Sequence, residues 1–170
     1  MLTRMLIREA EAEDWPAIWP IFSEIVRAGE TYTYPRDIDQ DAARTLWMLA
    51  PPGSTVVALD EEGRVLGTAK MNPNQPGGGS HVASASFMVD PAVAGRGVGR
   101  ALGEYALSWA RRERYRAMQF NAVVESNSAA VTLWKVLGFE IIATVPEAFR
   151  LPTGEYVGLH VMYRRLPGSG

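Results

Sequence analysis

The sequence predicts an α/β domain built on one mixed, mostly antiparallel sheet of six to seven strands, with helices on both faces. Short β-branched and apolar runs alternate along the chain with amphipathic helical patterns. Residues 54–72 are predicted to form a hairpin, because two such runs flank an acidic turn that contains Gly63. A hairpin makes part of the sheet antiparallel, which disfavours a purely parallel doubly wound fold.

Glycine, proline and aspartate residues mark where the helices and strands of the N-terminal half begin and end. Gly29 and Pro35 interrupt the first long loop, and Asp90-Pro91 ends the last strand of this half. The expected elements are, in order, a strand over 5–10, a helix that Asp14 caps, a loop over 28–39, a helix over 40–49, the hairpin over 54–72, a glycine-rich loop over 73–80 and a strand over 81–89.

The C-terminal half alternates helices and strands. The expected elements are a helix that follows the glycines of residues 95–99, a strand over 117–124, a helix over 127–137, a strand over 139–145, a loop over 146–156 and a final strand over 158–166. We expect a single domain over 1–166 and a flexible tail over 167–170. The final apolar strand is expected to pair or pack across a two-fold axis, which predicts a homodimer.

Composition excludes several classes of function. The 170 residues carry 17 basic and 19 acidic side chains, a net charge of −2 that gives no reason to expect a nucleic-acid partner. No apolar run is long enough to span a membrane, and the acidic N-terminal stretch does not resemble a signal peptide, so we expect a cytoplasmic protein. The absence of cysteine excludes disulfides, thiolate metal sites and a covalent cysteine intermediate, and we expect no metal.

Three glycines, Gly95, Gly97 and Gly99, stand directly before an amphipathic helix. Glycines at a helix N-terminus let an anion approach the free backbone amides, which predicts a phosphate site. The Walker pattern G-x-x-x-x-G-K-[ST] is absent. The dinucleotide pattern G-x-G-x-x-G fails because Arg100 and Leu102 occupy the required sixth positions.

The glycine stretch resembles the acetyl-CoA site of the GNAT family of N-acetyltransferases. That family's signature, Q/R-x-x-G-x-G/A, is matched here by residues 94–99, with Ala94 in place of the leading Gln or Arg. A second stretch, "NSAAVTLWKVLGF" (127–139), is similar to the family's N-x-x-A-x-x-L-Y-x-x-x-G-F, with Trp134 at the usual tyrosine position. The resemblance covers nearly the whole chain and implies a GNAT fold whose sheet splays between the fourth and fifth strands.

The resemblance also implies which residues hold coenzyme A. The pyrophosphate would lie on the backbone amides of the glycine loop, and the pantetheine arm would pair with the preceding strand like an extra strand. The implied cofactor-binding residues are Phe87, Met88, Val89, Ala94, Gly95, Arg96, Gly97, Val98, Gly99, Arg100, Asn127, Ala130 and Trp134. Arg96 and Arg100 equally suit a solvated surface, and Asn127 equally suits a plain helix cap.

The chemistry of amine acetylation sets further requirements. The oxyanion needs a hydrogen-bond donor, for which the resemblance implies the backbone N–H of Met88. The amine must lose a proton before attack, and the glutamate that relatives often carry on the fourth strand is missing. The remaining polar candidates around the acceptor are Ser84, Asn121, Glu30 and Tyr32. The indole of Trp134 cannot donate a proton to the thiolate, so water is the expected proton source.

The expected function is therefore transfer of an acetyl group from acetyl-CoA to the amine of a small molecule, an amino acid or an analogue, by direct attack in a ternary complex. Two alternatives stay open. One is acetylation of protein or peptide N-termini. The other is a degenerate acetyl-CoA-binding sensor, which Ala94, Trp134 and the missing strand glutamate favour.

Overall fold

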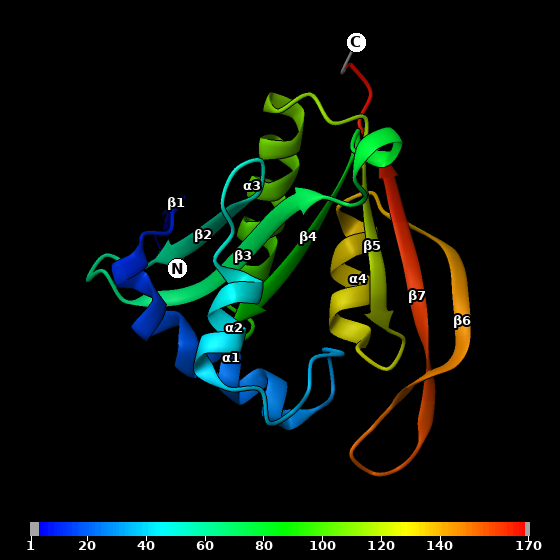
Figure 1. Ribbon diagram of the computed structural model, residues 1–170, viewed down its shortest axis with the longest axis horizontal. Coiled ribbons are helices and arrows are strands. Elements are labelled where there is room, and N and C mark those ends of the chain that lie inside the picture. Colours follow the sequence, from blue (N-terminus) through cyan, green and yellow to red (C-terminus); the bar gives the residue numbers. More distant parts are fainter. Residues whose placement is uncertain (1–3, 169–170) are drawn as a thin grey trace.

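The computed structural model describes residues 4–168 and contains one seven-stranded sheet, in the order β1-β2-β3-β4-β5-β7-β6 (Figure 1). Neighbouring strands are antiparallel except for β4 and β5, which are parallel. The strands are β1 (Leu6–Glu9), β2 (Ser54–Leu59), β3 (Val65–Pro73), β4 (Val82–Val89), β5 (Ala117–Val124), β6 (Glu140–Arg150) and β7 (Tyr156–Arg165). The mixed, mostly antiparallel sheet predicted from the sequence is confirmed.

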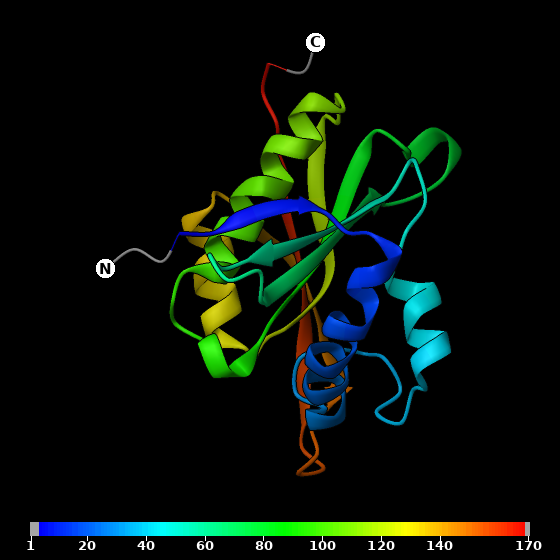
Figure 2. The same ribbon diagram turned by 90° about the vertical axis from the view of Figure 1, so that its left-hand side faces the viewer.

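Helices cover both faces of the sheet. Seen edge-on, α1 and α2 lie on one side and α3 and α4 on the other (Figure 2). The helices are α1 (Trp15–Ala28), α2 (Gln40–Trp47), α3 (Val98–Arg112) and α4 (Ser128–Val136), with short 3-10 turns at Ala12–Asp14, Gly77–Gly79 and Pro91–Val93. Each face of the sheet packs its helices over a separate apolar core. Few polar side chains are buried in either core.

The second helix ends two residues earlier than the sequence predicts. The side chain of Thr55 on β2 accepts a hydrogen bond from Leu49 N at 3.0 Å and donates to Trp47 O at 2.6 Å. A continuing helix would have bonded Leu49 N to Thr45 O, whereas Trp47 O would have faced Pro51, which has no N–H, so Thr55 supplies the missing partner and Met48 adopts an extended conformation. A tertiary contact therefore decides where the helix ends.

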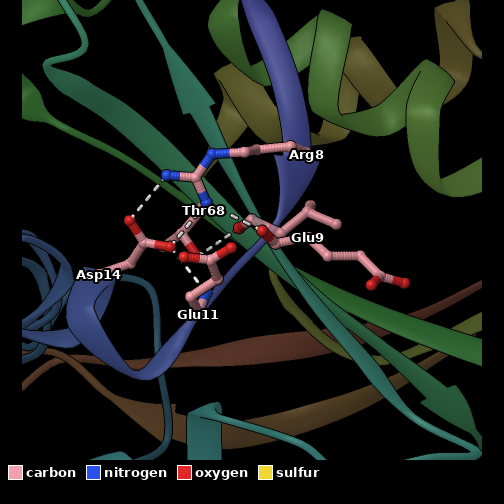
Figure 3. Close-up of polar contacts among 6 residues, drawn as sticks. Arg8, Glu9, Glu11, Asp14 and Thr68 are labelled. Atoms are coloured by element: carbon pink, nitrogen blue, oxygen red, sulfur yellow. Dashed lines mark hydrogen bonds and ion pairs between the residues drawn. The ribbon is translucent and has the colours of Figure 1, made fainter.

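Asp14 does not act as the simple cap that the sequence predicts. Its side chain makes no cap hydrogen bond to α1 and instead forms a two-point ion pair with Arg8 of β1, at 2.7 and 2.9 Å (Figure 3). The same carboxylate accepts from Glu11 N at 2.7 Å. The Arg8 guanidinium holds the pKa of Asp14 below its usual range. The cluster ties β1 to the start of α1.

The sheet separates between β4 and β5. The two strands pair only at Val82↔Ala117 and Ala83↔Met118 and then diverge (Figure 1). We call the unpaired stretch, residues 84–89 of β4 and 119–124 of β5, the split. On its other edge β5 pairs with β7, and a register shift between Phe120 and Val123 places a bulge inside the split.

The C-terminal strands form a long hairpin whose edge differs from the expectation. The final strand β7 lies between β5 and β6, so β6 rather than the final strand is the edge strand on this side of the sheet. Leu166 is buried, and its N–H donates to Arg116 O at 2.9 Å. Residues 169–170 of the expected tail lie outside the described residues. Within 4–168 no helix has the length and apolarity that a membrane span needs.

Candidate active site

The backbone of β4 presents hydrogen-bonding groups to the split at Phe87. In an antiparallel ladder, successive residues turn their N–H and C=O groups alternately toward and away from the partner strand. Asp90 N donates to Leu66 O of β3 at 2.9 Å, and the register pairs Met88 with Thr68 and Phe87 with Ala69. The backbone N–H and C=O of Met88 therefore point at β3, whereas those of Phe87 and Val89 point into the split.

A tyrosine from the loop between α1 and α2 hydrogen-bonds the backbone N–H and C=O of Phe87. The Phe87 N–H donates to the Tyr32 hydroxyl oxygen at 3.0 Å, and the Tyr32 hydroxyl donates to Phe87 O. The ring of Tyr32 stacks on Tyr34 with a centroid distance of 5.7 Å and an interplanar angle of 5°. Burial raises the pKa of the Tyr32 phenol, so the hydroxyl keeps its proton at neutral pH.

The geometry differs from the sequence-based expectation for the oxyanion donor. The resemblance implies that Met88 donates from its N–H, but the register of β4 directs that group at β3, and the Met88 side chain is buried in the core beneath α1 and α2. The outward N–H groups of this part of β4 belong to Phe87 and Val89. The N–H groups of successive β4 residues point alternately toward β3 and toward the split. The sequence pattern does not show which residues point toward β3.

The glycine loop leads directly into the N-terminus of α3. Gly95 and Gly97 have φ values of 81° and 83°, in the left-handed region that favours glycine. Gly97 is the N-cap residue and supplies no side-chain hydrogen bond, so no cap side chain covers the first amides of α3, which begins at Val98. Ala94 has φ −56° and ψ 143°, a conformation that any residue adopts. This end of α3 is suited to an anion.

The side chains of the glycine loop and the first turn of α3 differ in burial and in ion pairing. Val98 is buried in the core, so that only its backbone is available to a ligand. The exposed Arg100 pairs with Glu104 one turn later, with an Nε–Oε1 distance of 3.1 Å. Arg96 is exposed, and within the described part of the chain it forms no ion pair. Arg96 therefore remains a positive charge beside the loop.

The start of α4 lies next along the chain after β5. Asn127 caps this helix, because its side-chain oxygen accepts from Ala130 N at 3.3 Å. Trp134 is buried and packs on Phe87 and Phe120, with centroid distances of 4.7 and 4.8 Å. Ala130 packs at the edge of the same core. Phe87 thus bonds to Tyr32 through its backbone and packs on Trp134 through its side chain.

The remaining acceptor-side candidates are only partly brought together. Asn121 lies in the β5 bulge, where its amide donates to the Asn74 side-chain oxygen at 2.6 Å and its own oxygen accepts from Gln119 at 3.0 Å. Ser84 is half-buried on β4, and Glu30 is exposed. No hydrogen bond among the described residues joins either of them to Tyr32 or Asn121. Tyr32 is the candidate that reaches the backbone of β4.

Sequence reasoning missed Asn74. It follows the last residue of β3, and its N–H donates to Val82 O at 2.8 Å, which holds it beside the start of β4. Its side chain then reaches Asn121 on β5. The only signal in the sequence is an asparagine at the entrance to a glycine-rich loop, and loop composition alone explains it.

A shallow cavity of about 340 Å³ lies elsewhere, between α3, α4 and β7. Arg111, Gly138 and Arg164 contribute to its lining, and Arg164 donates to Leu137 O at 2.7 Å. Arg111 stands at the opposite end of α3 from the glycine loop. Among residues 4–168 no cluster of three or more His, Asp or Glu side chains could bind a metal ion.

Solved structures share this architecture. The chain is 59% identical to a GCN5-related N-acetyltransferase from Kribbella flavida, with a TM-score of 0.92 over 95% of this chain and 98% of that one. It is 27% identical to yncA from Salmonella typhimurium, whose structure includes its cofactor acetyl-CoA, with a TM-score of 0.80 over 96% and 95% of the two chains.

Curated relatives agree with the structures. The chain is 30% identical over 117 residues to the N-acetyltransferase aca1 of Schizosaccharomyces pombe, which covers 68% of this chain but only 56% of that protein. It is 32% identical over 147 residues, 84% of each protein, to the L-methionine sulfoximine/L-methionine sulfone acetyltransferase of Salmonella typhimurium. The profile of the acetyltransferase (GNAT) family matches residues 7–139. With the split sheet and the glycine-capped α3, these matches show that the chain belongs to the acetyltransferase (GNAT) family.

Proposed function

We propose that this protein transfers the acetyl group of acetyl-CoA to the amine of a small molecule, by direct attack in a ternary complex. The observation that carries the proposal is the outward-facing backbone of β4 at Phe87. The strand ends at Val89, close to the N-terminus of α3, whose first amides are covered by no cap side chain. The amides of an extended pantetheine arm can pair with the free backbone groups of a strand, and a pyrophosphate can bind at an anion site. The described structure offers the two in succession along one stretch of chain.

The cofactor would lie along this stretch. Backbone amides from Gly95 to Arg100 would hold the pyrophosphate, with Arg96 adding positive charge from the exposed side. The outward groups of Val89 would pair with an amide of the pantetheine arm inside the split, and Phe87 would lie beside the thioester. The capped start of α4 at Asn127 and the buried ring of Trp134 would border the other side of the arm.

The Phe87 N–H is the group that we assign to the oxyanion. As the amine attacks the thioester carbon, negative charge grows on the carbonyl oxygen, and a backbone donor already fixed in the sheet stabilises it without reorganisation. Phe87 replaces Met88 in this role because the Phe87 N–H points into the split, whereas the Met88 N–H points at β3. The chain contains no cysteine to carry an acetyl group, which supports direct transfer.

The acceptor would bind on the side of the sheet covered by α1 and α2. Tyr32 and Asn121 reach the split from the two flanking elements, and Ser84 and Glu30 are further candidates. We propose an amino acid or amino-acid analogue as the acceptor. The Salmonella typhimurium relative, named for L-methionine sulfoximine and L-methionine sulfone, supports this class because the match covers 84% of each chain.

Acetyl-CoA turnover over a panel of amines tests the proposal. The panel would contain L-methionine sulfone, L-methionine sulfoximine, proteinogenic amino acids, simple alkylamines and peptides with free N-termini. We expect release of coenzyme A with amino-acid-type acceptors, and intersecting double-reciprocal lines. Turnover confined to peptides would move the function to N-terminal acetylation. Tight acetyl-CoA binding without turnover on any acceptor would indicate a sensor.

A further inference from the structure

The Tyr32 hydroxyl occupies the position that the acetyl carbonyl oxygen needs. Its oxygen lies 3.0 Å from Phe87 N and accepts the hydrogen bond of that N–H. A carbonyl oxygen bound by the same N–H would lie at about 2.9 Å from the nitrogen along the same direction. Because two oxygens cannot share that volume, the thioester and the phenol compete for one donor.

We propose that Tyr32 is a further catalytic residue, which yields the Phe87 N–H to the acetyl carbonyl of acetyl-CoA and then donates a second hydrogen bond to that carbonyl oxygen during attack. The inference rests on the acetyl transfer proposed above. It assigns to one side chain two effects of opposite sign, since the phenol opposes binding of the acetyl group and accelerates its transfer.

The loop that carries Tyr32 permits this movement. Residues 29–39 between α1 and α2 form no helix or strand, and the hydrogen bonds near the two ends of this loop, such as Gly29 N to Val26 O and Ile38 N to Pro35 O, do not include the backbone of Tyr32. The nearly parallel stack of Tyr32 on Tyr34 allows one ring to slide over the other while contact is kept. A retreat of about 2.7 Å, one O–H···O distance, leaves the phenol oxygen next to the incoming carbonyl oxygen.

The displaced phenol is a better donor to the transition state than to the ground state. Burial raises the pKa of Tyr32, which keeps the proton on its oxygen. The thioester carbonyl is a neutral acceptor, but attack turns it into an oxyanion, and a hydrogen bond to an ionised acceptor is roughly twice as strong. The Phe87 N–H and the Tyr32 O–H would then hold the oxyanion together.

The step balances without a proton from Tyr32. The amine nitrogen attacks the thioester carbon, the C–N bond forms, and the carbonyl π pair moves onto oxygen. Collapse restores the C=O bond and breaks the C–S bond, which releases the thiolate of coenzyme A. The proton of the former amine passes to solvent, and solvent protonates the thiolate. Tyr32 is a hydrogen-bond donor throughout.

Two other side chains near Phe87 do not offer this interaction. Trp134 contacts the ring of Phe87 from the α4 side and carries no hydroxyl. The Asn121 amide already donates to Asn74. Among the described residues, Tyr32 is the one whose side chain hydrogen-bonds the backbone of Phe87.

The test uses Tyr32→Phe, with Tyr34→Phe as the matched control from the same ring stack. Calorimetric titration with acetyl-CoA and with coenzyme A separates the acetyl group from the rest of the cofactor. We expect Tyr32→Phe to bind acetyl-CoA about three- to tenfold more tightly, the worth of one net hydrogen bond, and to bind coenzyme A as the wild type does. Its kcat should fall about a hundredfold. Tyr34→Phe should change none of these values.

A variant that binds both cofactors equally less tightly, or keeps the wild-type ratio of the two affinities, would overturn the inference. A wild-type protein that binds no acetyl-CoA would instead overturn the proposed function. A second measurement does not depend on the variant's folding. In the wild type, the Phe87 amide resonance should move on addition of acetyl-CoA and stay in place with coenzyme A. Equal movement with both cofactors would contradict the competition.

Discussion

The side chain of Asn121 on β5 hydrogen-bonds that of Asn74 at the end of β3, with an Nδ2–Oδ1 distance of 2.6 Å, although β4 lies between these strands in the sheet. The contact fixes the amide of Asn121 at the β5 bulge, beside the place where β4 and β5 separate. It therefore holds the polar side chain of Asn121 at the edge of the split, where the acceptor is proposed to bind.

Replacing Asn121 by alanine is expected to lower turnover but not cofactor affinity. Loss of one hydrogen bond to the acceptor costs about 0.5–1.5 kcal/mol, which lowers kcat/KM about three- to tenfold. Asn74→Ala should give a smaller loss, since it frees the Asn121 amide without removing it. Steady-state kinetics together with acetyl-CoA titration check both variants. Equal losses of turnover and acetyl-CoA affinity would place the acceptor pocket elsewhere.

The glycine loop can be tested against a glycine of the same conformation. Gly97 and Gly63 have φ values of 83° and 80°, and an added Cβ would meet no atom within 4 Å at either position. Valine at either site should cost at least about 1–2 kcal/mol of folding stability, because L side chains disfavour this region. Only Gly97→Val should also weaken coenzyme A binding, since Gly63 lies in the turn between β2 and β3. Similar coenzyme A affinity in the two variants would argue against the anion site.

The Arg8–Asp14 ion pair predicts a pH dependence of stability. The pKa of Asp14 is lowered in the folded protein, chiefly by its hydrogen bonds to Arg8. The contribution of ionised Asp14 to the free energy of unfolding is therefore fully present above the ordinary carboxyl pKa. It is lost as the pH falls through the lowered pKa of Asp14. Asp14→Asn should reduce the free energy of unfolding near pH 7 by about 1 kcal/mol, because the half-exposed Arg8 is partly screened.

The difference between Asp14→Asn and wild type should disappear in strongly acidic solution, which thermal unfolding at several pH values would show. Glu104→Gln is the matched control, since Glu104 and Arg100 form a largely exposed surface pair. That variant should lie within about 0.5 kcal/mol of the wild type. A deficit for Asp14→Asn that persists unchanged at low pH would contradict the assigned cause.

The edge strand β6 predicts association. Ile142 and Val145 on this strand are 56% and 52% exposed, and the apolar ring of Tyr156 on β7 is 56% exposed. An exposed apolar edge strand is a site for pairing with a second chain, so we expect a homodimer. Light scattering should give twice the chain mass, and Val145→Lys should shift the population toward the monomer. A monomeric wild type at high micromolar concentration would refute the dimer.

The sequence predicted those features that depend on local chemistry. The positive φ values of Gly95 and Gly97 follow from glycine clustering before a helix, and the order of strands and helices follows from periodicity. Long-range contacts were not predictable. Tyr32 and Phe87 are 55 residues apart, and the loop that carries Tyr32 has no periodic pattern to orient it.

The choice between Met88 and Phe87 shows a second limit. Alternation predicts that neighbouring residues of β4 face opposite ways, but only the pairing with β3 shows which of them faces the split. The end of α2 has a similar origin, because Thr55 captures the backbone of Trp47 from a strand that follows later in the chain. Such tertiary contacts override local preference.

A crystal structure of the protein with acetyl-CoA tests the central claim most directly. We predict that the thioester lies in the split with its carbonyl oxygen about 2.9 Å from Phe87 N, and that the pyrophosphate contacts the amides of residues 98–100. Phe87 N would then no longer donate to Tyr32. An acetyl group bound away from β4, or a pyrophosphate held by Arg111 and Arg164 at the far end of α3, would contradict the account.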